Sequence, residues 1–244
     1  MVPRSTSARG SRSVVLAGVI LLLAFGGAWL AGRVAGWKTT PGSSEPTLEE
    51  LGDYGEVPAF TLTERSGRRV TRDDLRGLVW IVDFVYTECT ESCPAQSLQF
   101  AGLQQEFGDA ADLRLVSITV DPAHDTAEVL RRYAERYRAG DRWWFLTGDK
   151  RDIYCLARQG FRLGVTDPAA PDQPACGQVS SRGLTSAWAS RGSGGLIMHS
   201  ARVALVDRRR HIRAYHLATD PDSMGRLRSN LRRLLRADLA GSGS

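Results

Sequence analysis

The sequence lacks internal repeats and, apart from one short polar stretch, low-complexity tracts, which excludes a repeat protein and an extensively disordered chain. Lysine is also scarce: arginine supplies nearly all of the 32 basic residues, and the 27 acidic residues are interspersed with them. The formal net charge of +5 therefore predicts a mixed, solvated surface, and no nucleic-acid partner is expected.

One stretch, residues 226–236, departs from this mixed charge pattern. Four leucines recur there at helical spacing among five arginines. This pattern predicts a basic amphipathic helix that packs on the domain, and contact with anionic lipid is the alternative interpretation of the same pattern.

Charged residues are missing from Ser13 through Gly32, a run dominated by Val, Leu, Ile, Ala and Gly. At about 1.5 Å per residue, a helix of this length would cross a hydrocarbon core of about 30 Å. No clear Ala-x-Ala cleavage site follows, and no cysteine offers a point of lipid attachment, which favours an uncleaved anchor over a cleaved signal peptide. Residues 13–34 are therefore predicted to be a transmembrane helix.

The flanks of this predicted anchor indicate its orientation. Arg4, Arg9 and Arg12 precede the apolar run and outweigh the basic residues that follow it. The positive-inside rule then puts residues 1–12 in the cytoplasm. We expect the rest of the chain on the periplasmic or extracytoplasmic side of a bacterial inner membrane, joined to the anchor by a polar tether at residues 35–50.

Residues 51–240 fit one domain, in which strand and helix periods alternate. The predicted order is a hairpin about Ser66-Gly67, a strand at 78–85, a helix to Gly108, a strand at 113–120, a helix from Thr126, a strand at 143–146, a helix to Gly160, a hairpin at 201–217 and the basic helix. This order is typical of an α/β, thioredoxin-like fold with a central mixed sheet. The interval 166–195 is poorly periodic and predicts an insertion or a functional loop.

Cys89 and Cys93 directly follow the predicted strand at 78–85, where a helix begins. A thiolate at a helix N-terminus is stabilised by unpaired N–H groups and the helix dipole, which lowers its pKa. Three intervening residues and Pro94 differ from the two-residue gap of the ordinary thioredoxin-type motif and suit two soft ligands around one metal. Cu(I) is the favoured ion and zinc its competitor, while a structural disulfide or two inert buried thiols is the alternative.

His199 is the candidate third ligand, because it precedes the hairpin strand after a Gly-rich approach. In a thioredoxin-like domain the loop before that strand faces the helix that carries the cysteines, and one imidazole with two thiolates suits Cu(I) and can accommodate Cu(II). His211 and His216 are predicted to be surface or interstrand residues. A surface position is also favoured for His124, with a supporting role near the site as the alternative.

Cys155 and Cys176 remain, the first on a predicted helix and the second in the long interval. In an oxidising compartment a disulfide between them would fix that interval near its base, and closing a loop of about twenty residues is worth roughly 3 kcal/mol in the chain-entropy model.

At this point the chain resembles the SCO/SenC family of membrane-anchored copper-binding proteins, which take part in cytochrome c oxidase assembly. The resemblance is carried by the N-terminal anchor, Cys89-x-x-x-Cys93-Pro94, Ser117-Ile118-Thr119-Val120-Asp121-Pro122 with Asp125-Thr126, Leu146-Thr147-Gly148, and His199 before a strand that ends in Leu205-Val206-Asp207. Together these motifs span nearly all of the soluble part.

The resemblance implies that Cys89, Cys93 and His199 bind copper and that Asp121 supports the site. It also implies a metallochaperone, which delivers copper to the dinuclear copper site of cytochrome c oxidase or keeps the thiols of that site reduced. The implied partners are the copper-site subunit of the oxidase, a copper donor protein and a thiol reductant.

Two enzymatic alternatives use the same cysteines. A metal-independent thiol-disulfide oxidoreductase would use Cys89 as the attacking thiol and Cys93 as the resolving one. A peroxidase is disfavoured, because no arginine neighbours Cys89 in sequence, whereas Glu88 and Glu91 do.

Overall fold

The computed structural model describes residues 48–90, 92–166, 176, 188–192, 195–199 and 201–237, with the backbone alone for 166, 188–192 and 195–199. These residues all belong to one compact unit, Pro46–Ser244. The predicted cytoplasmic segment, the anchor and most of the tether lie outside the described residues. Within the described part of the chain, no helix has both the length and the apolar character that a membrane crossing requires.

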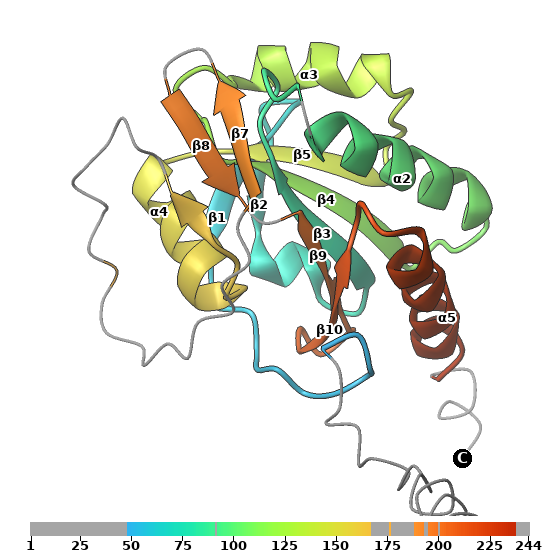
Figure 1. The fold of residues 1–244 in the computed structure, drawn as a ribbon. Coiled ribbons are helices and arrows are strands. Elements are labelled where there is room, and N and C mark those ends of the chain that lie inside the picture. The colour runs from blue at the N-terminus through green and yellow to red at the C-terminus, as the bar shows by residue number, and fades with distance from the viewer. Residues whose placement is uncertain are drawn as a thin grey trace, which may run out of the picture. The chain divides into compact units, whose positions relative to one another are not determined.

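A seven-stranded mixed sheet forms the centre of the fold (Figure 1), in the order β10-β9-β3-β4-β5-β1-β2. Its strands are β1 (Thr61–Glu64), β2 (Arg69–Thr71), β3 (Val79–Val85), β4 (Leu113–Thr119), β5 (Trp143–Thr147), β9 (Arg202–Val206) and β10 (Ile212–Leu217). The strands β3, β4 and β5 are parallel, whereas β9 and β1 pair antiparallel on either side of them. The predicted thioredoxin-like sheet and both of its hairpins are therefore confirmed.

The helices are α2 (Ser92–Glu106), α3 (Ala127–Arg136), α4 (Lys150–Cys155) and α5 (Pro221–Ala237). Two short elements accompany them, a 3-10 helix η1 (Arg72–Leu75) and a π-helix η2 (Leu156–Gly160) that continues α4. Thr126 caps α3 by accepting a hydrogen bond from the Val129 N–H, as a residue of its type before an apolar helical stripe predicts.

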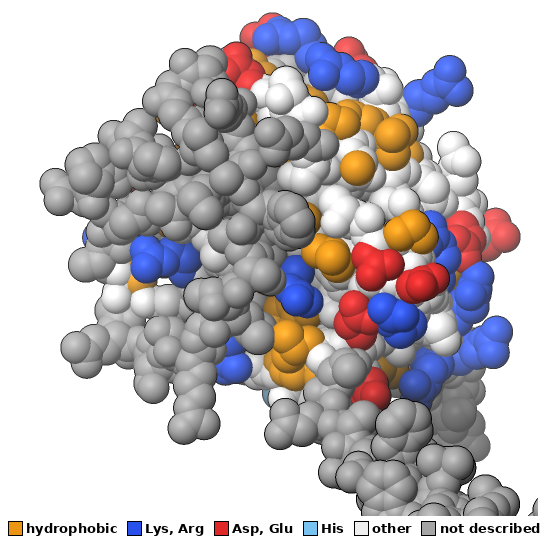
Figure 2. Space-filling view, viewed as in Figure 1, with side chains coloured by type: hydrophobic (Ala, Val, Ile, Leu, Met, Phe, Trp, Pro, Cys, Tyr) orange, Lys and Arg blue, Asp and Glu red, His pale blue; other side chains and the backbone are white. Residues whose placement is uncertain are grey.

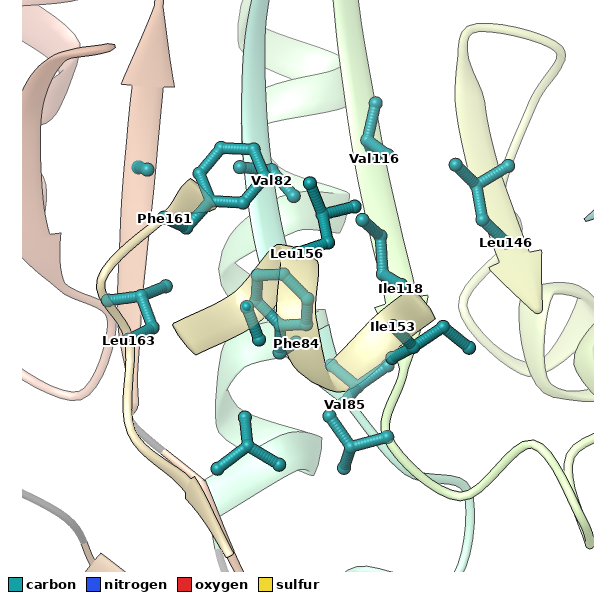
Figure 3. Close-up of a cluster of buried hydrophobic side chains, with 14 of the residues drawn as sticks. Val82, Phe84, Val85, Val116, Ile118, Leu146, Ile153, Leu156, Phe161 and Leu163 are labelled. Carbon is teal, nitrogen blue, oxygen red and sulfur yellow. The ribbon is translucent and has the colours of Figure 1, made fainter. Parts of the chain in front are cut away.

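Helices cover both faces of the central sheet, so β3 is buried along its whole length. Val79 and Ile81 face a cluster that includes Phe100 of α2 and Leu231 of α5. The alternate residues face the other cluster, in which Val82 and Phe84 lie with Ile153, Leu156 and Phe161 from α4 and η2 (Figure 3). Burial on both faces explains why the sequence of β3 is a nearly continuous apolar run.

A small second sheet includes the end of the interval 166–195, for which an insertion or a functional loop is predicted. It has the order β6-β8-β7, with β6 (Val165–Thr166), β7 (Trp188–Gly192) and β8 (Gly195–His199). The end of the interval is thus an antiparallel hairpin and not an irregular loop. Backbone pairing holds this hairpin, and such pairing requires no hydrophobic period.

The first described residues pack against α5, which is the helix predicted from the basic stretch. The Leu48 carbonyl accepts a hydrogen bond from the Tyr215 N–H at 2.7 Å, and the Glu49 carbonyl accepts one from the Asn230 amide at 2.7 Å. The Glu49 carboxylate also accepts a hydrogen bond from Ser223 at 2.6 Å and pairs with Arg226. The end of the predicted tether is therefore fixed on the domain beside α5.

His216 of β10 lies beneath this contact, and its side chain is fully buried against α5. Its Nε2 is 3.3 Å from the Asn230 side-chain amide, and Nδ1 has no hydrogen-bond partner. Burial lowers the pKa of His216 to about 4, and the nearby Glu49 carboxylate offsets only part of this shift. Of the two predicted positions for His216, surface and interstrand, the surface one is wrong.

This burial predicts an acid-dependent loss of stability. Between pH 6.5 and about 4 the unfolded chain binds a proton at His216 that the folded chain does not. The free energy of unfolding therefore decreases as the pH is lowered through this range. His216→Gln removes this proton uptake. When the pH is lowered from 7.5 to 4.5, the variant should therefore lose about 2–3 kcal/mol less free energy of unfolding than the wild type. Urea unfolding at several pH values measures this difference. The control is His211→Gln, since the pKa of His211 is raised by Asp53. Parallel pH profiles for wild type and His216→Gln would contradict the prediction.

Candidate functional site

Cys89 and Cys93 lie where β3 hands over to α2, as the sequence predicts. Cys89 is 6% exposed and precedes the helix, whereas Cys93 is fully buried in its first turn. The Cys93 N–H donates a hydrogen bond to the Cys89 sulfur at 3.4 Å. A backbone donor at the start of a helix therefore points at the first sulfur, which is the arrangement that stabilises a thiolate or a thiolate–metal bond.

The two cysteines are both thiols in the structure, and they differ in environment. Burial raises the pKa of the Cys93 thiol, the neighbouring Cys89 raises it further, and a hydrogen bond with the Tyr86 backbone offsets part of the shift. Cys93 therefore keeps its proton at neutral pH until a metal ion or a redox reaction displaces it, because only a thiolate binds metal strongly.

A buried carboxylate holds the loop that carries Cys89. Asp125 is fully buried, and its oxygens accept a hydrogen bond from the Thr87 N–H at 3.0 Å and further ones from the hydroxyls of Thr87 and Thr119. These contacts join the loop after β3 to the end of β4 and the start of α3. Asp125 thereby fixes the backbone two residues before Cys89.

His124 extends this network toward the cysteines. Its Nδ1 is 3.0 Å from Asp125 Oδ1, and its Nε2 is 3.2 Å from the carboxylate of Glu88, the residue directly before Cys89. Asp125 and Glu88 raise the pKa of His124, which is partly exposed. His124 is thus tied to the cysteine loop, which sequence reasoning had given only as the alternative to a plain surface position.

Asp121, the carboxylate expected to support the site, lies in the same loop but contributes less to it. Burial and the nearby Asp125 raise the pKa of Asp121. The hydrogen bonds that fix the cysteine loop go to Asp125, four residues later. The signal that would have identified Asp125 is its place in Asp121-Pro122-Ala123-His124-Asp125, one residue before the Thr126 helix cap.

His199 is described in its backbone alone, so its distance from the sulfurs stays a prediction. It ends β8, where it pairs with Val165 and Trp188, and β9 begins three residues later. His199 therefore precedes the hairpin strand, which is β9, as expected; it ends the strand β8, however, and does not itself begin β9. The register of β3 with β9 pairs Val82 with Ala204, so the start of β9 lies toward the cysteine end of β3. Among the described side chains, no group of three or more His, Cys, Asp or Glu residues forms a metal-binding cluster.

A second buried carboxylate, Asp83, was not identified from the sequence. It occurs in β3 opposite Ser117 of β4, is fully buried, and neither of its oxygens has a partner in hydrogen-bonding geometry. Burial raises the pKa of Asp83 to about 7, and Ser117 offsets only part of this shift. The signal in the sequence is a single acidic residue inside an otherwise apolar strand.

Gln96 lies on α2 one turn after Cys93 and is also fully buried, with neither amide atom hydrogen bonded. The next residue, Ser97, contacts the Tyr133 hydroxyl at 2.9 Å. Asp83 and Cys93 are close enough for the carboxylate to raise the pKa of the thiol. The first turn of α2 therefore covers a polar part of an otherwise apolar core.

Cys155 and Cys176 are bonded as a disulfide across 21 residues of sequence. The bond joins the end of α4 to the interval before β7. It is the pairing that the sequence suggests for a domain in an oxidising compartment.

The Asp125 contacts predict that this residue matters more than Asp121. Asp125→Ala leaves three donors without an acceptor, the buried Thr119 hydroxyl and two partly buried donors of Thr87, and should lower the free energy of unfolding by about 3 kcal/mol, whereas Asp121→Ala should cost less than about 1 kcal/mol. Urea unfolding of the two variants measures both effects. Equal losses in the two variants would show that Asp125 does not fix the loop.

Asp83 predicts a pH dependence opposite to that of His216. Between pH 3.8 and about 7 the folded chain keeps a proton on Asp83 that the unfolded chain releases, so this residue lowers stability as pH rises. When the pH is raised from 4 to 8, the free energy of unfolding of Asp83→Asn should therefore increase by up to about 4 kcal/mol relative to that of the wild type. Thermal unfolding across this range tests the gain, with the exposed Asp109→Asn as control. A constant difference from the wild type would mean that Asp83 does not titrate in this way.

The fold and the cysteine pair define a thioredoxin-like α/β domain with two buried thiols at the start of its first long helix. The SCO1/SenC family model matches residues 49–235, and the chain belongs to this family. The "SCO1 protein homolog" of Bacillus subtilis is 34% identical over 121 residues, covering 48% of this chain and 63% of the relative. This match spans somewhat less than two thirds of that relative. A "putative copper-binding protein" of Stutzerimonas stutzeri is 29% identical over 164 residues, covering 65% of this chain and 69% of the relative.

Solved structures share the fold. A SCO1/SenC family lipoprotein from Bacillus anthracis has a TM-score of 0.60 at 22% identity, over 73% of this chain and 94% of that one. BsSco, a member of the Sco family of cytochrome c oxidase assembly proteins, has a TM-score of 0.58 at 24% identity, over 76% of this chain and 96% of that one. Bradyrhizobium japonicum ScoI with copper bound has a TM-score of 0.55 at 21% identity, over 74% of this chain and 99% of that one.

Proposed function

We propose that this protein is a copper-binding assembly factor that delivers copper to the dinuclear copper site of cytochrome c oxidase, or keeps the cysteines of that site reduced. The observation that carries the proposal is the buried cysteine pair at the start of α2, with the Cys93 N–H directed at the Cys89 sulfur. Membership of the SCO1/SenC family and relatives that bind copper support the same conclusion.

The proposed ligands are Cys89, Cys93 and His199. Two adjacent soft sulfurs favour Cu(I), and an imidazole nitrogen allows Cu(II) to bind at the same site. The register of β9 with β3 supports the third ligand, because it directs the chain after His199 toward the cysteine end of the sheet. Copper binding at Cys93 displaces the proton that its burial retains, so affinity should increase with pH.

Residues 13–34 are proposed to anchor the chain in the inner membrane, with the domain on the extracytoplasmic side. Two considerations support this location. The disulfide between Cys155 and Cys176 is stable in an oxidising compartment, and the proposed oxidase partner is itself a membrane protein. The remaining proposed partners are a copper donor protein and a thiol reductant for Cys89 and Cys93.

Competition titration with a chromophoric Cu(I) chelator tests the three ligands. The wild type should bind one copper per chain, and Cys89→Ala, Cys93→Ala or His199→Ala should each weaken binding by about 100-fold or more, which corresponds to at least about 2.8 kcal/mol. The control is His211→Ala, which removes a partly exposed histidine paired with Asp53. Unchanged Cu(I) affinity in His199→Ala would exclude the three-ligand site and leave a two-cysteine site.

A thiol-disulfide oxidoreductase is the second candidate function. The Cys89 side chain raises the pKa of the Cys93 thiol, so the two side chains are neighbours, as an attacking and a resolving cysteine must be. Such an enzyme would reduce a client disulfide without metal and would retain its rate in His199→Ala. Assays of apo wild type, Cys93→Ala and His199→Ala on a peptide disulfide separate the two functions. A metal-independent rate that survives loss of His199, together with no copper binding, would favour the enzyme.

A further inference from the structure

The outward side of α5 carries positive charge that the domain does not neutralise. Leu227, Leu231 and Leu234 of this helix are buried, whereas Arg233 and Arg236 are exposed. Three other arginines of α5 pair with carboxylates. Arg226 pairs with Glu49, and both Arg228 and Arg232 pair with Glu106. Neither Arg233 nor Arg236 forms an ion pair with any described residue. Figure 2 shows basic side chains along the edge of the molecule where α5 lies in Figure 1.

The turn between β9 and β10 brings two more arginines to the same end of the domain. Arg208 of this turn donates to the Leu234 carbonyl at 2.8 Å, and its own carbonyl accepts from Gly77 at 3.1 Å. Its sequence neighbour Arg209 and the Gly77 neighbour Arg76 are both exposed and without an ion pair among the described residues. We call Arg76, Arg209, Arg233 and Arg236 the basic end.

Three acidic side chains near the basic end are already engaged, whereas Glu50 is exposed and lines the same groove as Arg233. Asp112 pairs with Arg208, and Asp73 pairs with Arg210. Glu49 is held by Arg226 and Ser223. Among the described residues, four unpaired arginines against one unengaged carboxylate leave an excess of positive charge at the basic end. A guanidinium group suits a phosphate because it can donate two parallel hydrogen bonds.

The basic end lies at the opposite end of the sheet from the cysteines. Val79, the first residue of β3, donates to the Asp112 carbonyl at this end, and the seven residues of β3 then lead to the cysteine loop. At about 3.3 Å per residue the strand separates the two ends by about 20 Å. A partner on the basic end would thus leave the cysteine site exposed.

The chain itself indicates which partner this is. The described residues begin beside the middle of α5, where Glu49 meets Arg226 and Asn230. If residues 13–34 are the anchor proposed above, the intervening residues 35–47 extend at most about 45 Å, at about 3.5 Å each. The tether therefore limits how far the domain can move from the membrane surface, so the basic end meets the headgroups at a high effective concentration.

We propose that the basic end docks on anionic phospholipid headgroups of the membrane that holds the anchor and orients the cysteine site away from the bilayer. This rests on the proposed anchor but not on the proposed copper chemistry. The contact is electrostatic, so it weakens as salt shortens the Debye length from about 8 Å at 0.15 M to about 3 Å at 1 M.

Arginine footprinting of the full chain tests the proposal. The protein is reconstituted in nanodiscs of phosphatidylcholine alone or with about one third phosphatidylglycerol, treated with phenylglyoxal, and analysed by mass spectrometry. Modification of Arg76, Arg209, Arg233 and Arg236 should slow by about threefold or more in the anionic discs and recover in 1 M salt. Arg131, exposed on α3, should react equally in both discs.

Charge reversal provides the second arm. Arg233→Glu with Arg236→Glu should abolish the protection of Arg76 and Arg209, whereas the matched pair Arg69→Glu with Arg131→Glu should leave it intact. Rapid modification of the four arginines in both kinds of disc would overturn the proposal. Equal protection in both kinds of disc would also overturn it, because protection that does not require phosphatidylglycerol indicates a protein contact. Copper stoichiometry measured on the same samples reports on the proposed function separately, because these substitutions lie away from the cysteines.

Discussion

Burial of β3 on both faces is the constraint on which the rest of this domain depends. A strand with helices on each side must be apolar at nearly every position, and it must end in a loop that leaves the core in a fixed direction. In this chain the loop carries Cys89, and α2 begins three residues later. The position of both sulfurs is therefore set by the packing of a central strand.

A buried strand fixes where the loop begins, but the loop itself needs a further restraint. Asp125 supplies it by accepting hydrogen bonds from the backbone and the hydroxyl of Thr87 and from Thr119. The carboxylate comes from the loop after β4, the neighbouring parallel strand, so two adjacent strand ends are tied together at one edge of the sheet. Loss of a rigid loop would separate the sulfurs from the helix N–H group that stabilises them.

The sequence predicts the parts of this arrangement that arise from local pattern. Apolar runs and helical spacing give β3, β4, α2 and α5 to within a few residues, and the cysteines fall at the strand–helix junction as expected. The hairpin of β7 and β8 was missed because interstrand backbone bonds define it and its residues carry no hydrophobic alternation. The roles of Asp125 and Asp83 were missed for a different reason. Whether a carboxylate accepts three hydrogen bonds or none depends on which segments the fold brings beside it, so the sequence signals of Asp125 and Asp83 mark the two positions but not their partners.

Asp83 shows that the region beneath the cysteines is not optimised for stability. A fully buried carboxyl without a hydrogen-bond partner costs free energy that an apolar residue would not, yet β3 contains it next to Ser117 and within electrostatic reach of Cys93. Gln96 adds a second unsatisfied polar group on the helix above. Asp83 and Gln96 both lie near the first turn of α2, whereas the opposite face of β3 packs against the apolar side chains of α4 and η2. Polar groups without partners in a well-packed core commonly accompany functional sites, because they stabilise a charge or a proton that is present only during function. In the proposed function Cys93 releases its proton when it binds metal and recovers it afterwards, and Asp83 lies within electrostatic reach of this thiol.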